Sequence, residues 1–397
     1  MWWLALGRLP ATTATRMLAP LLGVIAAGVG MSLVTAGALV AVFEAMGFAS
    51  PVAGWVIDRV GARRTMLVAL AGFGAAALGA AASSGLPSFA IAIVGLGLTA
   101  MVYESASTVW VAAATPYHQR AAMLGRLDTA WAGGLLAGVP IVAALSLWTW
   151  RSAYVAVAAL TFAAWWQVRR RVVAPTPAAG AVPTGAVPGG RPRWRWPTVR
   201  RGLWIVVPFG LLAAASQLVV VVYGVWLDER HGFPTAVIGA VGFVFGLGDL
   251  AATVTTMRVT DRIGKARAVR IGLGVLVLAA LVLAAVHRSP LAGIVALLVL
   301  LVGYEFALLS AKPLLTEIDP DHRGLGIGLG FGAAAACRGP AAIVGTAAFS
   351  AGGLGWTALL AATTGALSLV IFLVGGARTE SSILGGSDAS VSTGGRR

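Results

Sequence analysis

Residues 54–64 read GWVIDRVGARR, and residues 257–267 read MRVTDRIGKAR. Both segments carry Asp-Arg-x-Gly followed by basic residues, and Asp58 and Asp261 are separated by 203 positions. Two further pairs recur at nearly the same offset: Tyr103-Glu104 with Tyr304-Glu305, and Pro140 with Pro340. Three matches at one offset predict that the chain consists of two repeated halves.

The composition around these segments is that of a membrane protein. Of the 397 residues, 58% are hydrophobic and only 11% are charged, and the mean hydropathy is +0.88. A soluble domain has about 25% charged residues, so a soluble globular protein, a disordered chain and a disulfide scaffold are all excluded. The one cysteine, Cys337, cannot form an intramolecular disulfide. A β-barrel would show far more alternating polar residues, which leaves an all-α membrane protein.

Charge-poor stretches long enough to cross a bilayer predict twelve transmembrane helices, since each crossing needs about 20 apolar residues. They are 7–27, 33–55, 65–83, 87–112, 123–147, 152–168, 202–227, 235–257, 269–286, 290–312, 324–350 and 355–377. The first is interrupted by Arg8 and Arg16. It must nevertheless cross, because the run from 17 to 57 is too long for one helix and can turn back only at residues 28–32.

The positions of the basic residues predict the orientation. An even number of spans puts both termini on one side, and the loops on that side carry most of the 27 arginines and two lysines. The opposite loops carry only Arg151, Arg230 and Arg288. By the positive-inside rule both termini are expected in the cytoplasm. The net charge of +15 therefore needs no nucleic-acid partner. The preference for arginine over lysine favours a bacterial protein, and hence a location in the bacterial cell membrane.

A Pro-, Gly- and Arg-rich stretch separates the halves. We predict an N-terminal six-helix half at 1–168, a cytoplasmic linker at 169–201, a C-terminal six-helix half at 202–377 and a disordered cytoplasmic tail at 378–397. Repeated six-helix halves are typical of transporters that hold their substrate at the midplane between them.

These features resemble the major facilitator superfamily. Residues 54–64 match its loop motif G-x-x-x-D-R-x-G-x-R-R, and Trp150-Arg151 with Tyr154 is similar to its W-R-x-x-F entry to the sixth span. The resemblance implies a fold of two pseudo-symmetric six-helix halves. It also implies a conformational latch, for which the matching positions are Gly54, Asp58, Arg59, Gly61, Arg63, Asp261 and Arg262. For Arg63, Arg64, Lys265 and Arg267, orientation in the membrane is the alternative role. Met257 replaces the motif glycine in the second copy, and the region 90–95 lacks the arginine of many drug antiporters.

Six ionisable residues lie well inside predicted spans: Arg16, Glu44, Glu104, Asp249, Glu305 and Arg338. Charges at membrane depth are costly and usually functional or paired. We therefore predict a substrate or proton pathway from these six together with Tyr103, Tyr304 and Gln217. The alternative is structural ion pairing, of Arg16 with Glu44 or Glu104, and of Arg338 with an acid of the other half. Arg126, Asp128 and Lys312 lie nearer the cytoplasmic ends of their spans.

These observations favour a secondary active transporter of a small molecule, coupled to protons and with efflux as one direction. A uniporter or an uptake symporter of a small organic anion is the alternative. No nucleotide-binding motif or metal-ligand pattern is present, so we expect no cofactor and no metal. A membrane enzyme would need clustered catalytic groups, and a receptor or scaffold would need large soluble domains. The expected partners are the substrate, protons and the bilayer, with the protein acting as a monomer.

Overall fold

The computed structural model describes residues 2–146, 148–172 and 196–388, and the side chains of most of them. Every regular element in these ranges is helical. The N-terminal elements are α1 (Trp2–Val29), α2 (Leu33–Ala45), η1 (Met46–Ala49), α3 (Ser50–Val60), α4 (Ala62–Ala81), α5 (Leu86–Ala114), η2 (Tyr117–Gln119), α6 (Arg120–Gly133), η3 (Gly134–Gly138), α7 (Val139–Ser146) and α8 (Trp150–Arg171). The C-terminal ones are α9 (Trp196–Val220), α10 (Tyr223–His231), α11 (Thr235–Ile263), α12 (Lys265–Val286), α13 (Pro290–Leu315) and α14 (Arg323–Asp388).

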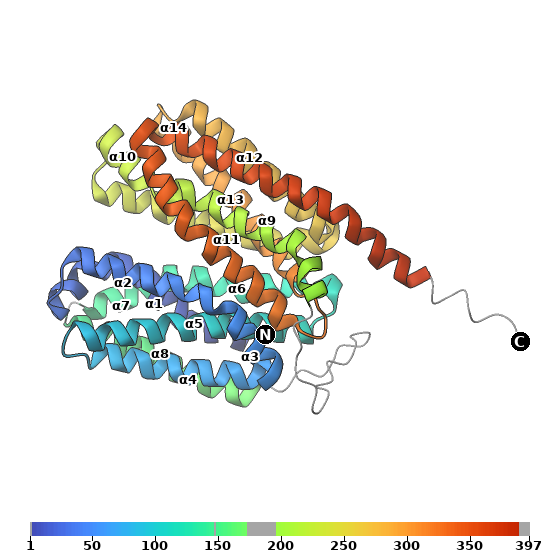
Figure 1. Ribbon diagram of the computed structural model, residues 1–397. Helices are drawn as coiled ribbons and strands as arrows, with labels where there is room; N and C mark the ends of the chain where they lie inside the picture. Colours follow the sequence, from blue (N-terminus) through green and yellow to red (C-terminus); the bar gives the residue numbers. More distant parts are fainter. Residues whose placement is uncertain (1, 147, 173–195, 389–397) are drawn as a thin grey trace, which may run out of the picture.

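The helices form two bundles, which confirms the predicted all-α fold of two halves. Helices α1 to α8 make one bundle and α9 to α14 the other (Figure 1). Seven helical segments in the described part of the chain are long and apolar enough to cross a membrane. The remaining predicted passes correspond to α1 and α8 and to the broken helices α2–α3 and α6–α7. The twelfth pass is the second arm of α14, which bends at Gly352 and Gly353.

Close contacts explain why two predicted spans are broken. The Thr12 hydroxyl of α1 lies 3.1 Å from the carbonyl oxygen of Ala130 and can donate to it or to the Leu9 carbonyl of its own helix at 2.9 Å. Helix α6 widens into the π-turn Gly134–Gly138 directly afterwards. A Cβ on Gly134 would lie 2.5 Å from the Thr12 hydroxyl, so the glycine permits this approach. Similarly, the 3-10 segment η1 lies where Gly47 meets Ala335 of α14.

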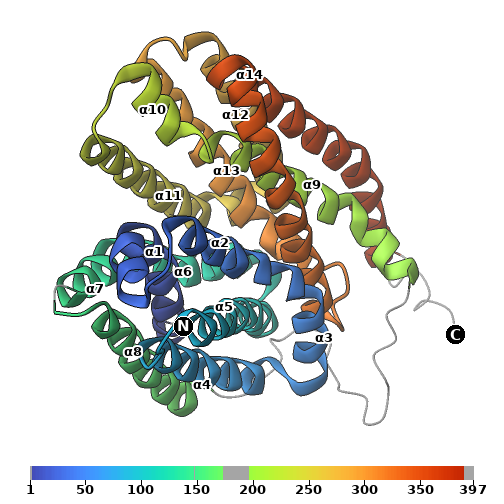
Figure 2. The same ribbon diagram turned by 60° about the vertical axis from the view of Figure 1, so that its left-hand side comes forward.

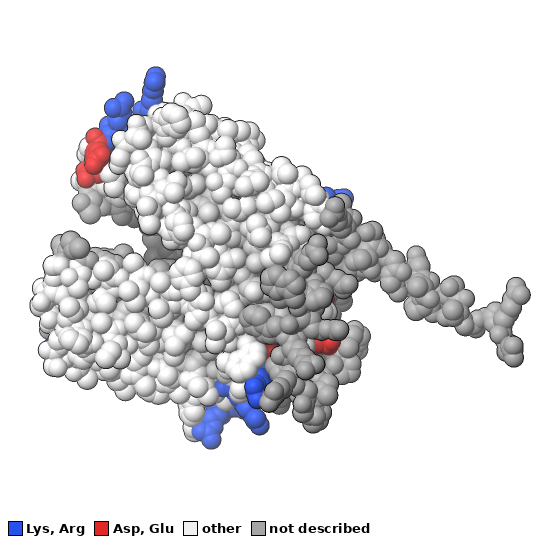
Figure 3. Space-filling model, viewed as in Figure 1, with Lys and Arg blue, Asp and Glu red and all other residues white. Residues whose placement is uncertain are grey.

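The halves meet at one end of the molecule and separate at the other. Helix α3 packs against α14 and α6 against α11; we call the end with these contacts the closed end. The opposite end, which carries α10 and the turn after α1, is the open end. Figure 2 shows the two bundles diverging toward it, and the space-filling view shows a cleft between them there (Figure 3).

The exposed arginines follow the predicted asymmetry. At the closed end and in the helix turns next to it they are Arg59, Arg64, Arg126, Arg169, Arg170, Arg171, Arg258, Arg262 and Arg267, and at the open end Arg151, Arg230 and Arg288. Trp3 lies beside Arg171, so the start of α1 is at the closed end.

The predicted linker and tail fall partly outside the described residues. Residues 173–195 and 389–397 are outside them, whereas α8 and α9 extend into both ends of the predicted linker. Helix α14 continues to Asp388, beyond the expected start of the tail at 378. Composition marked Ala377 as the end of the apolar run, but a helix can continue past its last apolar turn.

Candidate functional site

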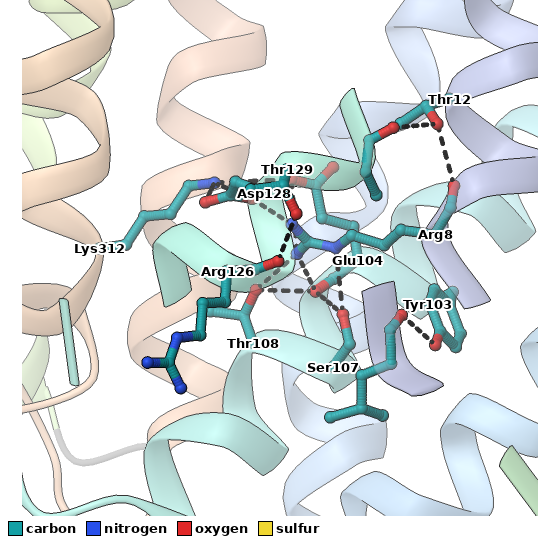
Figure 4. Close-up of polar contacts among 12 residues, drawn as sticks. Arg8, Thr12, Tyr103, Glu104, Ser107, Thr108, Arg126, Asp128, Thr129 and Lys312 are labelled. Carbon is teal, nitrogen blue, oxygen red and sulfur yellow. Dashed lines mark hydrogen bonds and ion pairs between the residues drawn. The ribbon is translucent and has the colours of Figure 1, made fainter. Parts of the chain in front are cut away.

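A buried arginine organises the interior of the N-terminal half. The Arg8 side chain is 3% exposed and lies within α1. Its guanidinium donates to Thr108 Oγ1 at 2.8 Å, to Ser107 Oγ at 3.3 Å, to the Glu104 carbonyl oxygen at 3.1 Å and to the Asp128 carboxylate (Figure 4). The Ser107 and Thr108 hydroxyls point their own hydrogens at the Glu104 carbonyl, so their lone pairs face the guanidinium. Arg8 is thereby held in one position.

Lys312 joins this group from the other half. Its ammonium lies 3.1 Å from both oxygens of Asp128 and 3.9 Å from Glu104 Oε1. Asp128 therefore binds cations of both halves, Arg8 from α1 and Lys312 from α13. The Asp128 and Lys312 side chains are 2% and 4% exposed, whereas Glu104 is 32% exposed. The bridge is thus buried, and Glu104 provides its most accessible edge. We call Arg8, Glu104, Asp128 and Lys312 the charge network.

The charges of the network balance only when the halves are together. Arg8 and Lys312 supply two positive charges, and Glu104 and Asp128 supply two negative ones. Without Lys312, the N-terminal half would hold one cation and two carboxylates in a buried setting. An uncompensated buried charge costs several kcal/mol, on the order of 3–5.

The C-terminal half holds a second polar group around α13. Arg338 of α14 donates to the Tyr304 hydroxyl at 2.5 Å. Glu305 lies within electrostatic range of Asp249, Lys312 and Arg338. All of these except Lys312 were predicted, and the fold brings them together.

The remaining predicted pathway residues are distributed differently. The Tyr103 hydroxyl donates to the Leu4 carbonyl at 3.0 Å and lies under Gly7, so it packs α5 against α1. Gln217 is half-buried on α9. Arg16 on α1 and Glu44 on α2 have side chains outside the described part of the structure. The predicted pairing of Glu104 with Arg16 is therefore not visible, and Glu104 instead contacts Arg8.

The latch motif lies at the closed end, where α3 meets the beginning of α14. Asp58 accepts hydrogen bonds from the backbone N–H groups of Gly324 at 2.8 Å and Leu325 at 2.9 Å. Both N–H groups lie in the first turn of α14, where the helix dipole favours an anion, and the Leu325 N–H also donates to the His322 carbonyl oxygen at 3.0 Å. Burial raises the pKa of Asp58 to about 6, against the opposing effect of the two N–H groups. At neutral pH the ionised form is present to accept both bonds.

The second copy of the motif makes the same contact on the other side. Asp261 accepts from the N–H groups of Ala122 at 2.8 Å and Ala121 at 3.3 Å, at the beginning of α6. Lys265 binds Asp261 at 2.8 Å. Met257 occupies the position of Gly54, and Gly125 on the facing helix leaves room for it. Gly125 thus provides the small residue at this contact, and the substitution of Met257 for glycine does not prevent the approach of the two helices.

The other motif residues shape and surround the turn. Gly61 has a φ of +93° between α3 and α4, a conformation that glycine adopts without strain. Arg63 donates to the carbonyls of Val172 and Arg169 at the end of α8. Arg59 stacks on Trp55, and Arg262 is exposed. Arg120 was not among the predicted site residues. It binds Glu317 and donates to Thr316 at 3.0 Å across the closed end.

Comparison with known proteins identifies the fold. The sequence profile described as Major Facilitator Superfamily matches residues 4–235. The chain belongs to this superfamily. A search of curated protein sequences finds no significant match. Superfamily membership and the bundle of apolar helices together identify a multi-pass membrane protein with a transporter fold.

Solved structures of other superfamily members are similar over nearly the whole chain. A proton:xylose symporter, XylE, is 15% identical with a TM-score of 0.74, covering 94% of both chains. The human organic anion transporter MFSD10 is 19% identical with a TM-score of 0.74, covering 93% of this chain and 98% of that one. A bacterial homologue of the iron transporter ferroportin in an outward-facing state is 14% identical with a TM-score of 0.75, covering 94% and 98%. At these identities the likeness concerns the fold.

Asp58→Asn should slow transport roughly tenfold while leaving folding nearly intact. The amide oxygen can still accept from Gly324 or Leu325, but a charge-assisted hydrogen bond becomes a neutral one, a loss of about 1–1.5 kcal/mol that corresponds to roughly tenfold. Transport rates in proteoliposomes, with helix content and elution volume as folding checks, measure the effect. Asp261→Asn is the matched variant of the second copy. Unchanged rates in Asp58→Asn would show that this carboxylate has no role in the conformational change.

Proposed function

We propose that this superfamily member is a proton-coupled secondary active transporter that works by alternating access. The observation that carries the proposal is the Lys312–Asp128 bridge, a buried ion pair between the halves. In this arrangement the closed end is sealed and the cleft faces the open end. The opposite arrangement would separate α13 from α6 at the closed end and withdraw Lys312 from Asp128.

A proton can replace Lys312 when the halves separate. The Arg8, Glu104 and Asp128 group then has one carboxylate more than cations, and burial favours protonation of the surplus acid. When the closed end forms again, the ammonium returns and displaces the proton. Lys312 and the proton thus compete for the same carboxylates, which links proton binding to conformation. Because the sequence has no nucleotide motif, an ion gradient is the proposed energy source.

The direction of transport follows from which side loads the substrate. Export in exchange for protons is the first candidate. A specific observation favours a second one, uptake or uniport of a small organic anion. Arg338 and Tyr304 present a guanidinium and a hydroxyl from the C-terminal half, and both can bind a carboxylate. A substrate screen in proteoliposomes with an imposed pH gradient distinguishes these transport modes from each other. It also distinguishes them from an enzyme or scaffold, which would move no compound.

We further propose that the closed end, with both termini, faces the cytoplasm of a bacterial cell. The arginine asymmetry supports this orientation. A cysteine at Gly85, at the open end, should react with an impermeant thiol reagent in intact cells, and one at Gly185 should not. The reverse pattern of labelling would overturn the orientation. Replacement of Cys337 by serine removes the native thiol from both variants.

Glu104→Gln or Glu305→Gln should abolish accumulation driven by a pH gradient but permit exchange or downhill flux. Glutamine keeps most of the shape and hydrogen bonding of glutamate and loses its titration. Accumulation and exchange of a compound found in the screen are compared in proteoliposomes. Glu229→Gln, an exposed acid at the open end, is the matched control. If both variants keep full uphill transport, the two glutamates are structural and the proton must bind at another acid.

A further inference from the structure

Five exposed arginines gather at the closed end of the N-terminal half, outside the charge network and the interface between the halves. They are Arg59 on α3, Arg64 on α4, and Arg169, Arg170 and Arg171 on α8; we call them the arginine cluster. Arg63 connects the elements, since it donates to the carbonyls of Val172 and Arg169. These two hydrogen bonds connect the beginning of α4 to the end of α8, so the arginines of these two helices lie on one surface.

Four members of the cluster stack on tryptophans. The guanidinium-to-ring distances are 5.3 Å for Arg59 on Trp55, 5.2 Å for Arg169 on Trp165, 4.1 Å for Arg170 on Trp166 and 5.3 Å for Arg171 on Trp3. Tryptophan prefers the boundary between the hydrocarbon and the headgroups of a bilayer. Trp166 is 45% exposed, so the ring can reach lipid. The stacked arginines are thereby fixed at headgroup depth.

Among the residues that the structure describes, no carboxylate forms an ion pair with these arginines. The first 172 residues contain four acids, and none follows Asp128 until Asp228. Glu104 and Asp128 bind Arg8 and Lys312, and Asp58 binds the beginning of α14. Glu44 belongs to α2, on a different span.

The open end offers a contrast within the same molecule. Its exposed Arg230 directly follows Asp228 and Glu229. Arg151 uses its guanidinium to bind the carbonyls of Ala81 at 3.0 Å and Ser83 at 2.9 Å. Arg230 therefore lies beside acids and Arg151 is hydrogen-bonded, whereas no member of the cluster has an ion pair or a side-chain hydrogen bond among the described residues.

We propose that the arginine cluster is a binding site for the headgroups of anionic phospholipids in the leaflet at the closed end. Guanidinium groups bind phosphate oxygens in a planar, two-pronged manner, and the tryptophan rings place them at the depth of those phosphates. A basic surface beside a membrane-spanning helix attracts anionic lipid through each of its charges. Such binding is independent of whether transport is coupled to protons.

The test compares two double variants that each remove two exposed positive charges. Arg170→Gln with Arg171→Gln alters the cluster, and Arg230→Gln with Arg288→Gln alters the open end. Purified full-length protein is titrated with phosphatidylglycerol and, separately, with phosphatidylcholine, and retained lipid is counted by native mass spectrometry. At about fivefold in affinity per arginine, the cluster variant should bind phosphatidylglycerol roughly twentyfold more weakly than the wild type. The open-end variant should bind it as the wild type does.

Two further measurements keep the proposal testable if the cluster variant folds poorly. In the wild type, added sodium chloride should release phosphatidylglycerol and leave bound phosphatidylcholine unchanged. Inorganic phosphate at the same ionic strength should compete weakly, because it lacks the acyl chains that position a headgroup beside the tryptophans. Equal loss of phosphatidylglycerol in both double variants, no salt effect, or full displacement by phosphate would overturn the assignment.

Discussion

Asp128→Asn should abolish proton-coupled transport and destabilise the protein by about 3–5 kcal/mol, the cost of breaking a buried ion pair from one side. The substitution leaves Arg8 and Lys312 with Glu104 as the remaining carboxylate of the network. The bridge across the closed end then loses its charge attraction. Uphill accumulation in proteoliposomes and thermal unfolding of the purified protein measure the two effects. Asp228→Asn, an exposed acid at the open end, should change neither.

A double variant separates stability from coupling. Adding Lys312→Met to Asp128→Asn removes one charge of each sign, and methionine fills the space of the lysine stem. Stability should recover in part, because Arg8 and Glu104 then balance each other. Coupled transport should stay absent, because no cation competes with the proton. Coupled transport by the double variant would show that the bridge only stabilises the fold.

Gly324→Val should prevent the closed end from closing. A Cβ at this position would clash with the Gly54 carbonyl oxygen and lie 2.7 Å from Asp58 Oδ1, and both groups belong to the facing half. Overpacking of this kind costs about 1–3 kcal/mol, so the closed population should fall roughly ten- to hundredfold. Transport should fall with it, because alternating access needs both arrangements. Each half should still fold, since the clash lies between the halves.

Double electron–electron resonance between two spin labels measures this change. The labels are placed at Val60 and Arg267, which are exposed at the closed end on opposite halves. The variant should show a longer distance than the wild type. Gly274→Val is the matched control, because a Cβ on Gly274 meets nothing within 4 Å. An unchanged distance in Gly324→Val would mean that the contact of α3 with α14 does not hold the closed end.

The fold could be predicted from the sequence because it depends on local pattern, whereas the latch positions were taken from the resemblance to the superfamily. Apolar runs mark the spans, and the repeat around Asp58 and Asp261 marks the halves. The N–H groups that bind these acids could not be predicted, since they belong to helices of the opposite half. Met257 looked like a defect of the second motif because its compensation, Gly125, is distant in the sequence.

The charge network was missed for a related reason. Arg8 interrupted the predicted first span and was placed near its edge, but α1 begins at Trp2 and carries Arg8 inside the half. Asp128 and Lys312 were placed near the ends of their spans, whereas the closed end buries both. Their separation of 184 positions leaves no local signal. Glu104 and Glu305 match in sequence yet differ in surroundings, since Glu104 lies beside Arg8 and Glu305 lies near Asp249 and Arg338.

The most direct test of proton-coupled transport is the lumenal pH of proteoliposomes during the substrate screen, followed with a trapped pH-sensitive dye. A transported compound should change the lumenal pH when added to wild-type vesicles, and an imposed pH gradient should drive its accumulation. Asp128→Asn vesicles should show neither effect. A compound that equilibrates through the wild-type protein with no pH change, and that no pH gradient concentrates, would contradict proton coupling.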